Sequence, residues 1–171
     1  MEDHSPRERY GSAAANCMRS AYADARVEAL RRGDRKIGTE HLALAVLRDP
    51  MCAHALGRTV EDGRAALESL DQDALKAVGI EASACTAPPI IPTGSRERLP
   101  LTPTAKSALH NAAKAAGRRI VSGHILCALL SRERPDSAAE LMAKLGVDTQ
   151  AVRAQLGDLL DTAARSPVDL I

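Results

Sequence analysis

The segment IGTEHLALAVL (residues 37–47) recurs in altered form as IVSGHILCALL (residues 120–130). In both segments an isoleucine, a hydroxyl residue and a histidine precede a run of six apolar residues, in the same order. The runs Leu42–Leu47 and Ile125–Leu130 are apolar around the whole circumference of a helix, so each is expected to be buried on every side. The recurrence predicts that the chain is built from two copies of one small helical unit.

The residues that precede each apolar run have predictable roles at a helix start. Thr39 and Ser122 stand where an N-cap hydroxyl accepts a backbone N–H, so both are predicted to be N-caps. His41 and His124 recur at one position of the motif. This recurrence favours packing or hydrogen bonding at the start of the buried helix over metal binding or catalysis.

The composition points to helices as the main secondary structure. Of the 171 residues, 45% are hydrophobic, yet phenylalanine and tryptophan are absent and only two tyrosines occur. Alanine and leucine favour helices, whereas the aromatic residues that favour strands are nearly missing. An alanine-rich amphipathic segment precedes each apolar run, and further short helical segments follow it. We therefore predict an all-α fold of two tandem four-helix repeats.

The division of the chain follows from its prolines and from the extent of the two copies. Four prolines lie between residues 79 and 100, a density that a helix cannot sustain, so this stretch is predicted to be a linker. The predicted segments are a disordered N-terminus at 1–7, a first repeat at 8–79, a proline-rich linker at 80–100, a second repeat at 101–164 and a C-terminal tail at 165–171.

Several classes of function are disfavoured by the sequence. The formal net charge is +1, and no basic stripe or aromatic platform suggests nucleic-acid binding. The longest apolar runs, of six residues, are too short to span a membrane, and the N-terminus does not resemble a signal peptide. No C-x-x-C pair, catalytic triad or phosphate loop occurs. We expect a cytoplasmic, monomeric protein that is not an enzyme and binds no metal or cofactor.

These motifs together resemble the Clp N-terminal repeat found at the N-terminus of ClpA, ClpB and ClpC unfoldases. The segment LTPTAK (residues 101–106) is similar to the start of that repeat, and LGVD (residues 145–148) is similar to its end. The resemblance extends over residues 8–164. In the family this domain precedes AAA+ ATPase modules, whose G-x-x-x-x-G-K-[ST] motif is absent from this sequence. We therefore expect a stand-alone double-repeat binding module.

The resemblance also implies a binding site. In the family this domain captures substrates and adaptors, and in the ClpC branch it recognises phosphoarginine. A carboxylate can accept the guanidinium through charge-assisted hydrogen bonds, while hydroxyls and N–H groups at a helix N-terminus hold the phosphoryl oxygens. An acid in a first helical turn also stabilises the helix through its dipole, so both readings of the carboxylate stay open. The candidate ligand-binding residues are Ser12, Thr39, Glu40 and Thr102.

Each copy retains one half of this implied site. The first copy keeps the carboxylate as Glu40, but Gly11 stands at the opening threonine position, with Ser12 beside it. The second copy keeps the hydroxyl as Thr102, but Gly123 replaces the carboxylate. We therefore expect weakened phosphoarginine binding, with the second copy the more affected.

A groove between the repeats is the other candidate surface, because in ClpC relatives it accepts cyclic peptide antibiotics. Its expected residues here are Tyr10 and Leu101. The predicted function is a non-catalytic accessory or decoy module of the Clp chaperone–protease system. Its predicted partners are Clp protease components, adaptors, or unfolded or arginine-phosphorylated proteins. The alternative is sequestration of cyclic peptide antibiotics or other small molecules in this groove.

Overall fold

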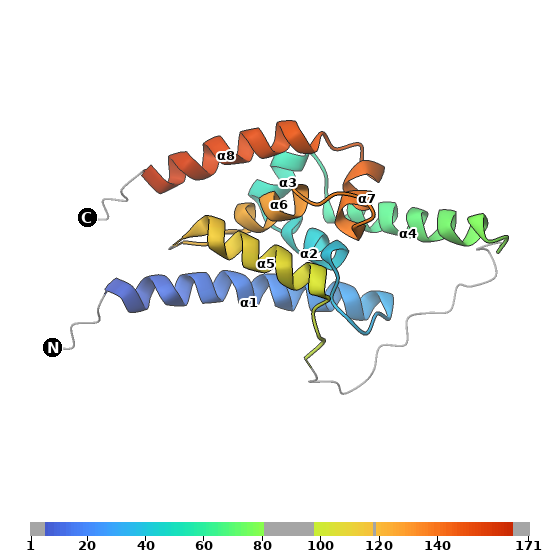
Figure 1. Cartoon of the computed structure of the whole chain (residues 1–171), viewed down its shortest axis with the longest axis horizontal. Helices are drawn as coiled ribbons and strands as arrows, with labels where there is room; N and C mark the ends of the chain where they lie inside the picture. Colours follow the sequence, from blue (N-terminus) through green and yellow to red (C-terminus); the bar gives the residue numbers. More distant parts are fainter. Residues whose placement is uncertain (1–5, 81–97, 118, 166–171) are drawn as a thin grey trace.

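The computed structural model of the chain describes residues 6–80, 98–117 and 119–165, and for residues 6–16 and 162–165 it describes the backbone alone. The described residues form eight α-helices, which confirms the predicted all-α class, and their one β feature is an isolated bridge. Four helices precede the predicted linker and four follow it (Figure 1). They are α1 (Pro6–Arg32), α2 (Thr39–Val46), α3 (Pro50–Leu56), α4 (Val60–Ala77), α5 (Pro103–Ala116), α6 (Ser122–Leu130), α7 (Ser137–Lys144) and α8 (Thr149–Arg165).

The two apolar runs form the centre of the molecule, as predicted. In Figure 1, α2 and α6 lie in the interior, with α1 along one side and α8 along the other. Every residue of the run Leu42–Leu47 is at most 5% exposed. In α6 the isoleucine and leucines are equally buried, whereas Cys127 and Ala128 are half-buried. The first central helix is thus enclosed on all sides and the second on most of its circumference.

The start of each central helix differs from the prediction by one residue. The N-caps are Gly38 and Val121, so Thr39 and Ser122 are the first residues inside α2 and α6, and their predicted role as N-caps is wrong. The cap N–H groups are instead satisfied by the recurring histidines. The N–H of Gly38 donates to Nδ1 of His41 at 3.0 Å, and that of Val121 donates to Nδ1 of His124 at 3.2 Å. The structural role predicted for both histidines is confirmed.

Side-chain caps start the outer helices of both copies. Asp49 and Asp136 accept N–H groups in the first turns of α3 and α7, and Thr59 and Thr102 do the same for α4 and α5. After α7 the chain turns at Gly146, where a φ of 66° favours glycine over other residues. These side chains set the starts of α3, α4, α5 and α7.

A buried ion cluster holds the first copy together. Glu28 of α1 is 0% exposed, and its carboxylate accepts hydrogen bonds from Arg64 of α4 at 2.6 Å and from Arg48, beyond α2, at 2.7 Å. Burial alone would raise the pKa of Glu28, but the hydrogen bonds from the two guanidinium groups lower it below its usual value. One carboxylate therefore ties three segments of the first copy.

The predicted linker lies largely outside the described residues, as do residues 1–5 and 166–171. Where the chain is described again, it pairs with the first copy. Leu101 forms a parallel β-bridge with Ile37. The N–H of Ile37 donates to the carbonyl of Pro100 at 2.9 Å, and the N–H of Thr102 donates to the carbonyl of Ile37 at 2.8 Å. The second copy thus begins against Ile37, the residue before the N-cap of α2.

The cysteines in the described residues, Cys17, Cys52 and Cys127, carry free thiols, and Cys85 lies outside the description. Burial raises the pKa of Cys52 to about 12 and also raises the pKa of the other two thiols. A thiol whose pKa is raised in this way stays protonated and packs as a small apolar group.

Candidate functional site

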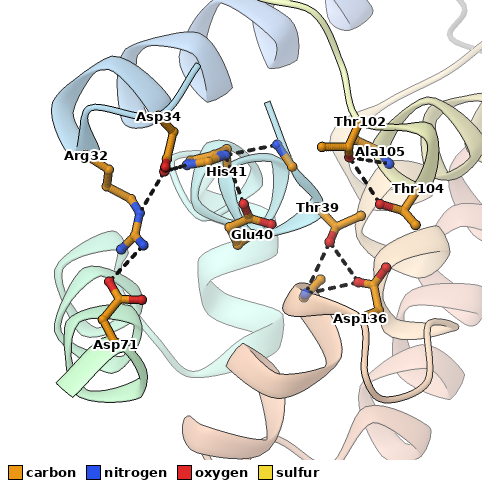
Figure 2. Close-up of polar contacts among 12 residues, drawn as sticks. Arg32, Asp34, Thr39, Glu40, His41, Asp71, Thr102, Thr104, Ala105 and Asp136 are labelled. Carbon is orange, nitrogen blue, oxygen red and sulfur yellow. Dashed lines mark hydrogen bonds and ion pairs between the residues drawn. The ribbon is translucent and has the colours of Figure 1, made fainter. Parts of the chain in front are cut away.

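The backbone pairing of Ile37 with residues 100–102 places the segments that carry the two retained halves side by side. Glu40 lies in the first turn of α2, three residues after Ile37, and Thr102 directly follows Leu101, the bridge partner of Ile37. We call this place, made of Gly38–His41 and Thr102, the junction (Figure 2). By sequence, Glu40 and Thr102 belong to different copies and to different implied sites. In the fold they lie at the same edge, because the start of the second copy pairs with the start of α2.

The Glu40 carboxylate lies over the backbone of Gly38 and is 20% exposed. Its Oε1 atom is 3.2 Å from Nδ1 of His41. That nitrogen already accepts the N–H of Gly38, so it carries no proton to donate, and we do not count this approach as an ion pair. Apart from this contact with His41, no hydrogen bond or ion pair among the described residues involves the Glu40 carboxylate. The carboxylate can therefore accept a hydrogen bond from a ligand.

The orientation of His41 is fixed by a chain of polar contacts behind it. Its Nε2 atom donates to Oδ2 of Asp34 at 3.0 Å (Figure 2). Arg32 bridges Asp34 and Asp71, donating from Nε at 3.2 Å and from Nη2 at 2.8 Å respectively. Burial alone would lower the pKa of Arg32, but the two carboxylates raise it. The network keeps His41 in one tautomer, with Nδ1 facing the N-cap.

Thr39 has a structural role that its position in the sequence does not suggest. Its side chain is 2% exposed, and its hydroxyl donates to Oδ1 of Asp136 at 2.7 Å. The same hydroxyl oxygen lies 3.3 Å from the N–H of Ala138, which also donates to Asp136 at 3.0 Å. Thr39 thus supports the N-terminus of α7 in the other copy, 97 residues from Asp136 along the chain. This engagement removes it from the ligand-facing surface.

Thr102 is half-buried and serves as the N-cap of α5. Its hydroxyl accepts the N–H of Ala105 at 3.2 Å and lies 3.1 Å from the hydroxyl of Thr104. The neighbouring Thr104 is exposed, so two hydroxyls stand at the start of α5. Beside them is an open depression of about 490 Å³, lined by Thr104, Ser131, Arg132, Glu133, Pro135 and Asp136.

Thr104 and Arg132, which line this depression, were not among the residues predicted from the sequence. Arg132 is positioned by Asp136, at 3.3 Å from Nε, and by the carbonyl oxygen of Thr104, at 3.4 Å from Nη2. The depression is walled by the connector between α6 and α7. The matching connector of the first copy, between α2 and α3, is shorter, and this difference in length between copies is the signal that the sequence carried.

The corresponding end of α6 is closed. Gly123 is buried, and a Cβ atom added there would lie 3.0 Å from Cε of Met51 and 3.2 Å from Cδ2 of Leu160. A hydrogen bond joins Ser122 and the thiol of Cys17, whose pKa is raised by burial in spite of that bond. Side chains from α1, α3 and α8 therefore occupy the space that the first copy leaves open beside Glu40.

The remaining candidates lie in α1 and at the bridge. Helix α1 begins at Pro6, so Ser12 lies inside the helix and not at its start. Cys17, which contacts the α6 end, is five residues further on, or about 7.5 Å along a helix. The side chains of Ser12 and Tyr10 lie outside the description. Leu101 is half-buried and packs against the core, so its side chain is part of the interior.

Two further features bear on the site's chemistry. Among the described residues, no group of three or more His, Cys, Asp and Glu side chains is arranged to hold a metal ion. In the same part of the chain, no helix combines the length and the apolar character needed to cross a bilayer. The junction offers a carboxylate, Glu40, and the hydroxyl of Thr102, with the hydroxyl of Thr104 and the guanidinium of Arg132 nearby, a set suited to binding polar groups.

Comparison with known proteins shows a likeness in structure. No family model matches the sequence, and no curated protein matches it significantly. Among solved structures, the chain is similar to the N-terminal domain of the caseinolytic protease-associated chaperone ClpD from Arabidopsis thaliana. The TM-score is 0.61 at 18% sequence identity, and the match covers 94% of this chain and 99% of that domain. The fold of this chain is therefore that of a Clp N-terminal domain.

Proposed function

We propose that the chain is a non-catalytic protein-binding module of the Clp chaperone–protease system, which captures arginine-phosphorylated proteins at the junction. One observation supports this proposal: the bridge between Ile37 and Leu101 pairs the segment that carries Glu40, a partly exposed acid, with the segment that carries Thr102, a helix-capping hydroxyl. The sequence suggested two half-sites. Their retained halves combine into one composite site per chain.

The chemistry of the junction suits a phosphorylated guanidinium. Glu40 accepts the guanidinium N–H groups, for which no other donor in the described residues competes. The hydroxyls of Thr102 and Thr104, together with the first turn of α5, face the phosphoryl oxygens. A guanidinium held without its acid partner loses about 1–3 kcal/mol, or about tenfold or more in affinity.

Isothermal titration calorimetry with a short phosphoarginine peptide tests the proposal. The native chain is expected to bind one peptide, and Glu40→Gln to bind it at least about tenfold more weakly. A matched control is Glu61→Gln, which changes an exposed acid in the first turn of α4. The unphosphorylated arginine peptide serves as the ligand control. Absence of heat with the native chain, or equal affinity for Glu40→Gln, contradicts the proposal.

The regulatory role is that of an accessory or decoy. By binding the same arginine-phosphorylated substrate as a Clp unfoldase, the chain competes with the unfoldase for it. Added to a degradation assay, it is expected to slow substrate loss in proportion to its concentration, while Glu40→Gln has no effect. Faster degradation on addition of the native chain would instead identify an adaptor. Unchanged degradation at saturating concentration would contradict both roles.

A further inference from the structure

Gly38 is the residue on which the Glu40 carboxylate rests. A Cβ atom added to Gly38 would lie 2.5 Å from the carboxyl carbon of Glu40 and closer still to both of its oxygens. Real Cβ atoms do not approach other atoms so closely, so any larger residue at this position must displace the carboxylate. The glycine is not required by the backbone, since its φ of −94° and ψ of −179° are ordinary extended values. Glycine is needed here because any side chain would occupy the space that the Glu40 carboxylate fills.

The position that this space provides has two consequences for the carboxylate. It keeps the negative charge over the N-terminus of α2, where the helix dipole favours it. It also keeps the charge beside Ile37, the residue paired with Leu101 and Thr102. A side chain turned away from Gly38 would leave both the dipole and the half of the junction that carries the hydroxyls.

We propose that Gly38 is a positioning residue for ligand binding: by lacking a side chain, it sets the Glu40 carboxylate in the geometry that accepts a guanidinium. This inference rests on the proposed function. It adds a residue that touches no ligand and acts only through Glu40. The missing side chain leaves the space in which the acid at this position of the motif rests against the N-cap residue.

The test is Gly38→Ala, a variant that leaves Glu40 itself unchanged. Alanine fits the backbone geometry, and its N–H can still donate to His41, so the capping of α2 is retained. We expect about tenfold weaker binding of the phosphoarginine peptide, similar to Glu40→Gln, with little change in melting temperature. The control is Gly157→Ala in α8, where an added methyl group meets nothing within 4 Å and binding should not change.

A double-mutant cycle separates positioning from a general structural effect. In the Glu40→Gln background, Gly38→Ala is expected to cause no further loss, because its effect passes through the carboxylate. Binding by Gly38→Ala that equals or exceeds the native affinity would overturn the inference. So would a loss of the same factor in both backgrounds.

A second readout needs no ligand and keeps the inference separate from the proposed function. In the native chain, nuclear Overhauser contacts are expected between the Gly38 Hα atoms and the Glu40 Hγ atoms, since the carboxylate lies over the glycine. They should vanish in Gly38→Ala. If the native chain binds no phosphoarginine, the proposed function fails, and these contacts still decide whether Gly38 sets the position of Glu40. Their absence in the native chain would overturn the inference.

Discussion

The starts of the two central helices are capped in the same way, but the residues next to the capping histidine differ. At α2 and at α6, a histidine in the first turn accepts the N–H of the N-cap residue, at 3.0 and 3.2 Å. At α2 the neighbouring residue is Glu40, whose side chain is 20% exposed and whose carboxylate lies 3.2 Å from Nδ1 of His41. At α6 the same position is Gly123, buried against Met51 and Leu160.

The difference separates what the fold requires from what a binding site requires. The histidine cap is kept in both copies because a buried helix start must satisfy its N–H groups. The acid is dispensable for the fold, since the α6 end is complete without it. A residue that one copy keeps and the other replaces by packing is therefore a candidate for function. This comparison favours Glu40 as the ligand-binding residue.

The largest loss of stability is expected when the acid of the α2 end is introduced at the equivalent position of the α6 end. Gly123→Glu places a carboxylate against Met51 and Leu160, where an added Cβ atom is already within 3.0–3.2 Å. Overpacking and burial of an unpaired charge together should lower the free energy of unfolding by more than about 3 kcal/mol. Urea unfolding followed by circular dichroism measures this loss.

Two companion variants sharpen the comparison. Gly123→Ala should stay within about 1 kcal/mol of the native chain, because the nearest atoms are the mobile ends of flexible side chains and alanine favours a helix. In a Leu160→Ala background, Gly123→Glu should lose less stability than it does alone, because the obstructing side chain is gone. Equal losses in both backgrounds would show that α8 does not close this end.

A middle-sized difference is expected between the hydroxyls at the two helix starts. Thr39→Val keeps the shape of the side chain but removes the donor to Asp136 and the second acceptor for Ala138, at a buried site. We expect a loss of about 1–2 kcal/mol in the free energy of unfolding. Ser122→Ala breaks only a bond with a thiol, a weak partner, and should lose less than about 0.5 kcal/mol. Equal losses would contradict the different roles assigned to these hydroxyls.

The sequence predicted the architecture because the architecture depends on local signals. The two all-apolar runs could only be interior helices, and the recurring order of residues around them predicted two copies. The limits of α7 are also set locally, by the cap at Asp136 and the turn at Gly146. These signals lie within a few residues of the structure they determine.

The details of the site depend on contacts between distant segments. Thr39 looked like an N-cap because it precedes an apolar run, yet its hydroxyl serves a helix 97 residues away. The pairing of Glu40 with Thr102 follows from the bridge between Ile37 and Leu101, and a bridge of one residue pair leaves no pattern in the sequence. Within the first copy, Ser12 is the hydroxyl next to the position that the resemblance pairs with Glu40. However, α1 starts at Pro6 and carries Ser12 inside the helix.

The smallest expected effect concerns the histidine of the α6 end and depends on pH. Burial lowers the pKa of His124. The folded chain thus binds this proton less readily than the unfolded chain does. Stability contributed by neutral His124 should therefore be complete above the ordinary histidine pKa of about 6.5 and decline as pH falls through it.

His124→Gln isolates this contribution, because a glutamine at this position can still accept the N–H of the cap but does not titrate in this range. From urea unfolding at pH 7.5 and pH 5.5, the free energy of unfolding should fall less in His124→Gln than in the native chain. His41→Gln serves as the matched variant at the other helix start. It removes the donor to Asp34 and should lower stability at both pH values, since that bond exists only at the α2 end. If His124→Gln and the native chain lose the same stability on acidification, His124 is not buried in its neutral form. The α6 end would then not be closed in the way that distinguishes it from the α2 end.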